Sequence, residues 1–111
     1  MVTVREEHDH RGHHVRLQGR LDVTSVPDLR MTMRQIIDDG HLPILLDLGE
    51  AEVGDATGLG FIVETARRSV RAGRLLSIPE AGDRTLRLLR RARQGHLLDL
   101  HPQTVGTLTA L

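Results

Sequence analysis

The stretch PILLDLGEAEVGDATGLGF, residues 43–61, joins an apolar run to the start of a helix. Residues 43–48 are almost continuously apolar, which is typical of a strand covered on both sides, as in a parallel sheet between helices. From Thr57 to about Arg71 the apolar residues recur at helical spacing, and Gly73 can close that helix. We therefore expect a central strand followed by an amphipathic helix that buries Leu59, Ile62, Val63, Ala66 and Val70.

The residues before this stretch predict a hairpin and a first helix. Apolar and polar residues alternate on either side of turn formers at 8–12, the apolar ones being Val2, Val4, Val15, Leu17 and Leu21. After Asp22 the spacing becomes helical, with Thr24 or Ser25 as the cap, Pro27 in the first turn and Gly40 at the end. The apolar residues on the expected buried side of this helix are Val26, Leu29, Met33, Ile36 and Ile37.

The residues after it continue the alternation of strand and helix. We expect a strand over 74–78, a turn over 79–83 and a basic helix over 84–93 that turns Leu86 and Leu89 inward. A short strand over 97–100 and one or two helical turns over 104–111 complete the order ββαβαβαβα. This order predicts a single α/β domain over 1–111, with a mostly parallel or mixed sheet and helices packed on it.

Composition excludes several classes of function. The 111 residues include one Phe, no Trp and no Tyr, so a groove that stacks single-stranded nucleic acid lacks its aromatic platforms. The absence of cysteine excludes disulfide frameworks and Cys-ligated metal sites. No apolar run reaches the roughly 20 residues that span a bilayer, and the first residues are too charged for a signal peptide. We expect a cytoplasmic protein without direct membrane insertion.

Charge is unevenly distributed along the chain. Residues 1–56 hold 6 arginines and 11 acids, whereas residues 57–111 hold 9 arginines and 4 acids. The basic helix over 84–93 could contact nucleic acid phosphates or orient a charged protein partner during encounter. We interpret it as a solvated helix face of a neutral protein and expect no nucleic acid partner.

Four histidines surround the expected hairpin turn: His8, His10, His13 and His14. Histidine-rich tracts can bind metal, and His8 and His10 share one face of a strand. His13 and His14 face opposite sides of a strand, so the whole cluster cannot converge on one ion. We interpret the tract as an exposed polar hairpin and expect no metal site.

The junction between the central strand and its helix is the candidate functional segment. Residues 53–60 form a helix start with free backbone N–H groups, an Asp55 that can cap, and glycines at 58 and 60 that remove side-chain cover. A partner or a phosphate could approach the backbone there. Alternatively, the segment is an ordinary capped helix whose glycines allow close packing on the sheet. It lacks the P-loop ending and the Rossmann frame, so nothing supports nucleotide hydrolysis.

Three separated blocks resemble one family. They are GRLD at 19–22, ILLDL at 44–48 and DATGLG at 55–60, the last leading into FIV at 61–63. In this order and spacing, over nearly the whole chain, they resemble STAS domains and within them the bacterial anti-anti-sigma factors. The resemblance implies that Asp22 and Asp55 line the partner-facing end of the sheet.

The resemblance implies a binding function. Such a domain docks on an anti-sigma factor that is also a serine kinase of the histidine-kinase-like ATPase fold, and thereby frees a sigma factor. Phosphorylation of the serine after the Asp blocks docking, and a phosphatase restores it. Ala56 occupies that position and has no hydroxyl, so docking is expected to be constitutive or regulated in another way.

Thr57 is the candidate phosphoacceptor within the motif. A helix advances about 100° per residue, so Thr57 points away from the Ala56 direction, and a kinase aligned for position 56 would misplace it. Alternatively, Thr57 hydrogen-bonds within the first turn. The expected partner-binding surface comprises Asp22, Thr24, Ser25, Asp55, Ala56, Thr57, Gly58, Leu59, Gly60 and Phe61.

Phe61 is expected to be a partly exposed anchor for a partner. It lies about 200° around the helix from Leu59, away from the expected stripe. Packing against a neighbouring helix is the alternative.

Alternatives remain for the acidic residues and for the branch of the family. Asp22 and Asp55 could form an acid–base pair or a magnesium site, but the sequence offers no third ligand and no nucleophile, so neither catalysis nor a cofactor is expected. Asp47 is expected to end its strand or to pair with an arginine. STAS domains also serve as subunits or tails of lipid and anion transporters, and the 55–63 motif favours the anti-anti-sigma branch.

Overall fold

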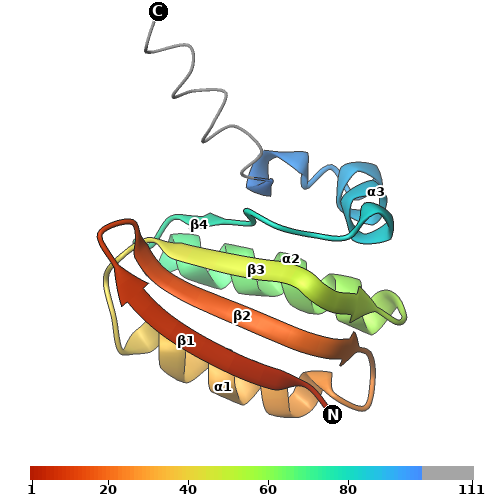
Figure 1. Ribbon diagram of the computed structural model, residues 1–111, viewed down its shortest axis with the longest axis horizontal. Coiled ribbons are helices and arrows are strands. Elements are labelled where there is room, and N and C mark those ends of the chain that lie inside the picture. Colours follow the sequence, from red (N-terminus) through yellow and green to blue (C-terminus); the bar gives the residue numbers. More distant parts are fainter. Residues whose placement is uncertain (99–111) are drawn as a thin grey trace, which may run out of the picture.

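The chain folds into one sheet flanked by helices (Figure 1). The computed structural model describes residues 1–98. Its elements in chain order are β1 (Thr3–Asp9), β2 (Gly12–Leu21), α1 (Val26–Asp38), β3 (Ile44–Val53), α2 (Ala56–Arg71), β4 (Leu76–Ser77), α3 (Asp83–Arg91) and the 3-10 helix η1 (Gly95–Leu97). Within residues 1–98, no helix is long and apolar enough to cross a bilayer.

The sheet is mixed and has the strand order β1-β2-β3-β4. β1 and β2 form the expected antiparallel hairpin, and the pairs β2–β3 and β3–β4 are parallel. In the β2–β3 register Leu21 lies opposite Val53, so both strands end at the same edge of the sheet. The α/β class and the element order predicted from the sequence are confirmed from β1 through α3.

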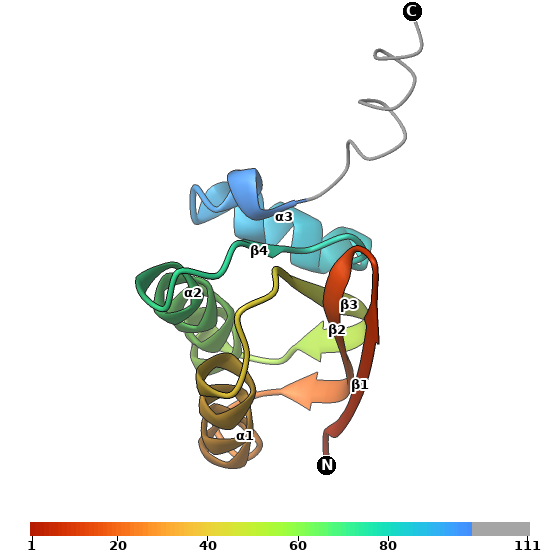
Figure 2. The ribbon, with the colours of Figure 1, turned by 90° about the vertical axis from the view of Figure 1, so that its left-hand side faces the viewer.

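The helices α1 and α2 lie side by side on one face of the sheet (Figure 2). Ile44, Leu46 and Leu48 of β3 are each fully buried in the core. The expectation that β3 is covered on both sides is wrong beyond Leu45, because the following residues on the other face are polar and partly or fully exposed. Leu45 lies on that other face but is buried too, so residues 44–46 are apolar without a break.

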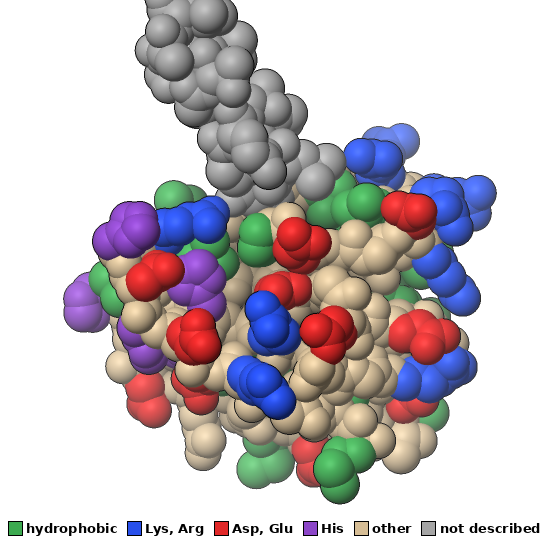
Figure 3. All heavy atoms as spheres, in the orientation of Figure 1, with side chains coloured by type: hydrophobic (Ala, Val, Ile, Leu, Met, Phe, Trp, Pro, Cys, Tyr) green, Lys and Arg blue, Asp and Glu red, His purple; other side chains and the backbone are tan. Residues whose placement is uncertain are grey.

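That other face carries cross-strand polar pairs between β2 and β3. Arg16 Nε donates to Asp47 Oδ2 at 3.1 Å, as expected for an arginine partner, and the Gln18 amide donates to Glu50. In Figure 3, which looks onto this face, basic and acidic side chains lie next to one another. The face is solvated and internally paired.

The buried stripe of α2 differs from the predicted one. The residues that face the core are Gly58, Phe61, Ile62, Thr65, Ala66 and Ser69. Leu59 and Val63 are only half-buried, and Val70 is 66% exposed. The predicted stripe was centred on Leu59, so the expected buried face is rotated away from the observed one. The observed face includes Gly58, through which α2 packs on β2, and a glycine adds nothing to a hydrophobic pattern.

The C-terminal part of the described chain crosses the β4 edge of the sheet. β4 is shorter than the expected strand over 74–78, and a single parallel bridge joins Ile78 to Leu98. The expected strand over 97–100 is largely replaced by η1 and that bridge, with residues 99 and 100 outside the described residues. The helical turns expected over 104–111 also lie outside them. In α3, Leu89 is fully buried and Leu86 is half-buried.

A buried arginine closes the end of α1. Arg74 is 2% exposed, and its guanidinium donates to the carbonyl oxygens of Ile36, Ile37 and Leu42 at 2.7, 3.1 and 2.7 Å. The last carbonyls of a helix have no partners within the helix, and a cation suits the negative end of its dipole. Arg74 therefore has a structural role that the sequence pattern did not indicate.

Candidate functional site

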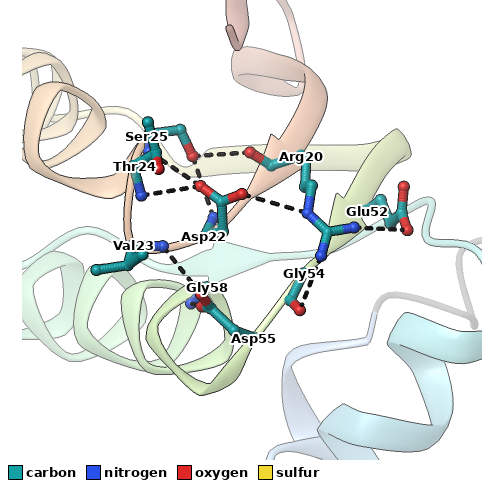
Figure 4. A network of polar contacts seen from close by, with 9 residues as sticks. All are labelled: Arg20, Asp22, Val23, Thr24, Ser25, Glu52, Gly54, Asp55 and Gly58. Atoms are coloured by element: carbon teal, nitrogen blue, oxygen red, sulfur yellow. Dashed lines mark hydrogen bonds and ion pairs between the residues drawn. The ribbon is translucent and has the colours of Figure 1, made fainter.

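The ends of β2 and β3 bring two loops together at one edge of the sheet. The Gly54 N–H donates to the Leu21 carbonyl at 2.8 Å, which joins the β3–α2 turn to the end of β2. Figure 4 shows the resulting network, with Asp22 in the β2–α1 turn and Asp55 at the start of α2. The predicted proximity of these two segments is therefore present in the structure.

Asp22 shapes the turn that leads into α1. Its Oδ1 accepts the N–H groups of Thr24 and Ser25 at 2.9 and 3.1 Å. These backbone donors, Ser25 before Thr24, lower the pKa of the Asp22 carboxyl below its usual range. Ser25 occupies the N-cap position, but its hydroxyl donates back to the Arg20 carbonyl at 2.7 Å and forms no cap bond. Ser25 is thus the N-cap residue, as expected, but it makes no side-chain cap bond, and Asp22 satisfies the turn instead.

Asp55 caps α2 and also holds the neighbouring turn. Its Oδ1 accepts the Gly58 N–H at 3.1 Å, and its Oδ2 accepts the Val23 N–H at 3.0 Å. The expected capping role of Asp55 is confirmed. Each carboxylate is thus engaged by backbone donors, which fixes the shape of a surface and does not prepare a group for proton transfer.

Arg20 completes the network from the end of β2. Its guanidinium donates to Asp22 Oδ2 at 3.2 Å, to Glu52 Oε1 at 3.3 Å and to the Gly54 carbonyl at 3.3 Å. It therefore connects the β2–α1 turn to the end of β3. Arg20 was not predicted as a functional residue, although it lies inside the block at 19–22 and could have been found there.

The two glycines of the motif serve different purposes. A Cβ at Gly58 would collide with the Leu21 carbonyl oxygen, so this glycine allows α2 to approach β2. A Cβ at Gly60 would meet nothing within 4 Å, and Gly60 is exposed. The packing interpretation is therefore correct for Gly58, and the open-surface interpretation is correct for Gly60.

The first turn of α2 presents small side chains to solvent. Ala56, at the first helical position, is exposed, and Thr57 and Leu59 are half-buried. Within residues 1–98 the Thr57 hydroxyl has no hydrogen-bond partner, so the expected alternative of a bond within the first turn is not realised. Of the ten residues predicted to bind a partner, eight are at least partly exposed at this edge of the molecule, whereas Gly58 and Phe61 are buried.

Phe61 was expected to contribute an exposed side chain to this surface. Its side chain is 1% exposed and belongs to the hydrophobic core, so the expectation of a partly exposed anchor is wrong. The alternative, packing inside the domain, is correct, because the contact face of α2 passes through Phe61 and Ile62.

The histidines lie at the opposite edge of the sheet. The rings of His8 and His13 stack with centroids 4.0 Å apart, and His14 Nε2 lies 2.8 Å from Asp9 Oδ1. His13 is buried rather than part of an exposed hairpin, and it contacts Glu6 Oε1 at 2.9 Å and Arg74 Nη2 at 3.3 Å. Among residues 1–98, no three His, Asp or Glu side chains are placed to hold a metal ion.

Comparison with known families decides the family of this chain. A family model described as "Mlab, STAS domain" matches residues 4–99. The chain belongs to the STAS domain family. No curated protein sequence matches this STAS domain significantly.

Solved structures share the fold of this STAS domain. An anti-sigma factor antagonist from Mycobacterium paratuberculosis superposes with a TM-score of 0.74 at 20% identity, covering 99% of this chain and 93% of that chain. The unphosphorylated form of the anti-sigma factor antagonist SpoIIAA gives 0.70 at 15% identity, covering 98% of each chain. The phosphorylated form of the Bacillus cell fate determinant SpoIIAA gives 0.67 at 15% identity, covering 96% of this chain and 99% of that chain. At these identities the likeness establishes the fold.

Proposed function

We propose that this STAS domain is an anti-sigma factor antagonist. It docks on an anti-sigma factor of the histidine-kinase-like ATPase fold and thereby frees a sigma factor for transcription. Docking uses the β2–α1 turn and the first turn of α2, at Asp22–Ser25 and Asp55–Gly60. The role is one of binding, with no chemical step on this chain.

One observation carries the proposal. Ala56 stands exposed at the first position of α2, directly after the capping Asp55 and beside the turn that Asp55 holds. The family motif places its phosphorylated serine at this position, so the surface that a kinase and its target share in such systems is open to solvent here. The likeness of the fold to anti-sigma factor antagonists supports the same role.

Ala56 removes the usual switch. Alanine cannot accept a phosphoryl group, so docking persists under conditions in which a serine at this position would be phosphorylated. Thr57 is the hydroxyl of the motif that remains, and it is half-buried and turned about 100° around the helix from Ala56. A phosphate there would add about −1.5 to −2 charge at pH 7. This charge beside Asp55 would weaken docking on an acidic surface.

The test is intact mass before and after incubation with ATP and a candidate anti-sigma kinase from the same genome. The expected result is a stable complex in which this chain stays unmodified or gains a single phosphate at Thr57. The variant Ala56→Ser is the control and should gain a phosphate at position 56. A phosphate mapped elsewhere, or no complex with any such kinase, would refute the proposal.

A second candidate is the STAS subunit of a lipid or anion transporter. It is favoured by the description of the matching family model, which names Mlab and no anti-sigma factor antagonist. Affinity capture with the full chain separates the candidates. Recovery of an ATPase-fold kinase supports the first, and recovery of a transporter subunit supports the second.

A further inference from the structure

A second exposed surface of α2 faces the end of α3. Between them lies a groove of about 540 Å³, lined by Leu59, Gly60, Val63, Glu64, Arg67, Arg71 and Ala92. We call it the α2–α3 groove. It begins one turn after Ala56, so it is continuous with the candidate docking surface.

The floor of the α2–α3 groove is apolar. Leu59 and Val63 are half-buried, and Ala92 follows the last turn of α3. Residues 56, 59, 63 and 70 follow a helical spacing of three, four and seven, so they share one side of α2. Val70, at the far end, is 66% exposed. An apolar strip therefore runs along α2, half-buried at Leu59 and Val63 and exposed at Ala56 and Val70.

The rim of the groove is basic. Neither Arg67 nor Arg71 forms an ion pair or a side-chain hydrogen bond with another residue of 1–98. The same holds for the exposed arginines of α3 and its end: Arg84, Arg87, Arg90, Arg91 and Arg93. By contrast, Arg16, Arg20 and Arg30 are each paired with carboxylates.

Glu64 is the acidic residue that lines the groove, and it does not neutralise Arg67 and Arg71. Arg30 Nε donates to both carboxylate oxygens of Glu64, at 3.1 and 3.2 Å, and draws that side chain toward α1. Positive charge without an internal partner therefore surrounds an apolar floor.

We propose that the α2–α3 groove binds an acidic amphipathic helix of a protein partner. The apolar side of that helix lies along Leu59, Val63 and Ala92, and its carboxylates pair with Arg67 and Arg71. Helix-in-groove recognition combines apolar anchors on one side with polar residues around them. The identification of that partner with the anti-sigma factor rests on the proposed function.

The shape of the site favours a protein over other polyanions. A nucleic acid backbone would use the arginines and leave the apolar floor uncovered, because its contacts are chiefly with phosphates. A flat membrane surface would not reach the floor of a groove between two helices. An amphipathic helix satisfies both the floor and the rim.

The first test uses a designed probe that needs no known partner. The probe is a helical peptide of about 18 residues, or five turns, with leucines at positions i, i+3, i+4 and i+7 and glutamates elsewhere. Titration into isotope-labelled full-length chain is expected to shift the amide signals of Leu59, Val63 and Ala92. The same peptide with lysine for glutamate is expected to leave them unchanged. No shift with the acidic peptide, or tighter binding of duplex DNA or of phosphatidylglycerol vesicles, overturns the proposal.

The second test uses matched charge reversals. The double variant Arg67→Glu/Arg71→Glu is expected to weaken the acidic peptide by about tenfold or more, which equals 1.4 kcal/mol. The double variant Arg84→Glu/Arg87→Glu changes the net charge equally at residues that do not line the groove, and it is expected to stay within about twofold. Val63→Asp adds a charge to the floor and is also expected to weaken binding. Equal losses in both double variants would mean general attraction, which contradicts a built groove.

Failure of this proposal is distinguishable from failure of the proposed function. If an anti-sigma ATPase binds the wild type and both double variants alike, the proposed function stands and the groove is not its contact. If the acidic peptide binds in the groove but no anti-sigma ATPase binds the chain, the groove stands and the proposed function falls.

Discussion

The Asp55 carboxylate accepts the backbone N–H of Val23 at 3.0 Å and so joins the start of α2 to the turn between β2 and α1. Its other oxygen accepts the Gly58 N–H within α2. One side chain therefore fixes the relative position of the two segments that form the candidate docking surface. Val23 itself is 65% exposed, so this hydrogen bond holds an otherwise open turn in place.

The variant Asp55→Ala tests this connection. It removes an N-cap and the bond to Val23, so we expect the free energy of unfolding to fall by about 1–2 kcal/mol. Hydrogen exchange should also accelerate at the Val23 and Gly58 amides. Asp83→Ala, at an exposed position in the first turn of α3, is the control and should leave both amides as they are. Unchanged exchange in Asp55→Ala would contradict the connection.

Gly58 and Gly60 offer a matched pair of substitutions. Gly58→Ala drives a methyl group into the Leu21 carbonyl, so we expect a loss of about 1–3 kcal/mol of stability, as for an overpacked site. Gly60→Ala meets open space in a helix and should gain up to about 1 kcal/mol. Urea unfolding of both variants measures the difference. Equal effects would mean that α2 does not approach β2 as closely as described.

Phe61→Ala should unfold the domain partially or completely. Because the ring is 1% exposed, its removal leaves a core cavity, and losses at such sites are about 3–5 kcal/mol. Thermal unfolding of the full chain measures the effect. A variant as stable as the wild type would contradict the burial of Phe61 in the core.

The order of strands and helices could be predicted because each element carries its own periodic signal. The hairpin, the parallel strands and the ends of α1 and α2 follow from alternation, helical spacing, Pro27 and Gly73, the last of which adopts a φ of 76°. The closeness of Asp22 and Asp55 was implied by the resemblance to STAS domains, and the structure explains it by neighbouring parallel strands that end at one edge of the sheet.

The side of α2 that is buried against the sheet could not be predicted in the same way. Gly58 contributes no hydrophobic signal, yet it marks the point of closest approach and places Phe61 inside. Arg74 was missed for a related reason. A charged residue in the core is recognised only when the carbonyls that it satisfies, at the end of α1, are brought to it by the fold.

Stability should depend on pH through His13. Burial lowers the pKa of His13 below its usual value of 6.5, against a hydrogen bond to Glu6 that raises it, while His8 and Arg74 lower it further. Below pH 6.5 the unfolded chain therefore binds more protons than the folded chain, so the free energy of unfolding falls as the pH drops from 6.5.

Urea unfolding of the wild type and of His13→Gln over the range from about pH 5 to pH 8 measures this dependence. Glutamine keeps a polar group between Glu6 and Arg74 but does not titrate. The wild type should lose more stability than the variant between neutral and acidic pH. Parallel curves for the two proteins would show that His13 does not contribute.

If the first turn of α2 is the docking surface for an anti-sigma factor of the ATPase fold, as we propose, a charge introduced there should weaken binding. Ala56→Glu places a negative charge at the first helical position, where the helix dipole favours it, so the domain should remain folded. Met31→Glu introduces the same charge on α1, where the native side chain is 66% exposed, and serves as the control.

The decisive measurement is the affinity of the purified anti-sigma factor for these three proteins by titration calorimetry. We expect Ala56→Glu to bind about tenfold or more weakly than the wild type, and Met31→Glu to stay within about twofold. Equal affinity of Ala56→Glu and the wild type would contradict the proposed docking surface.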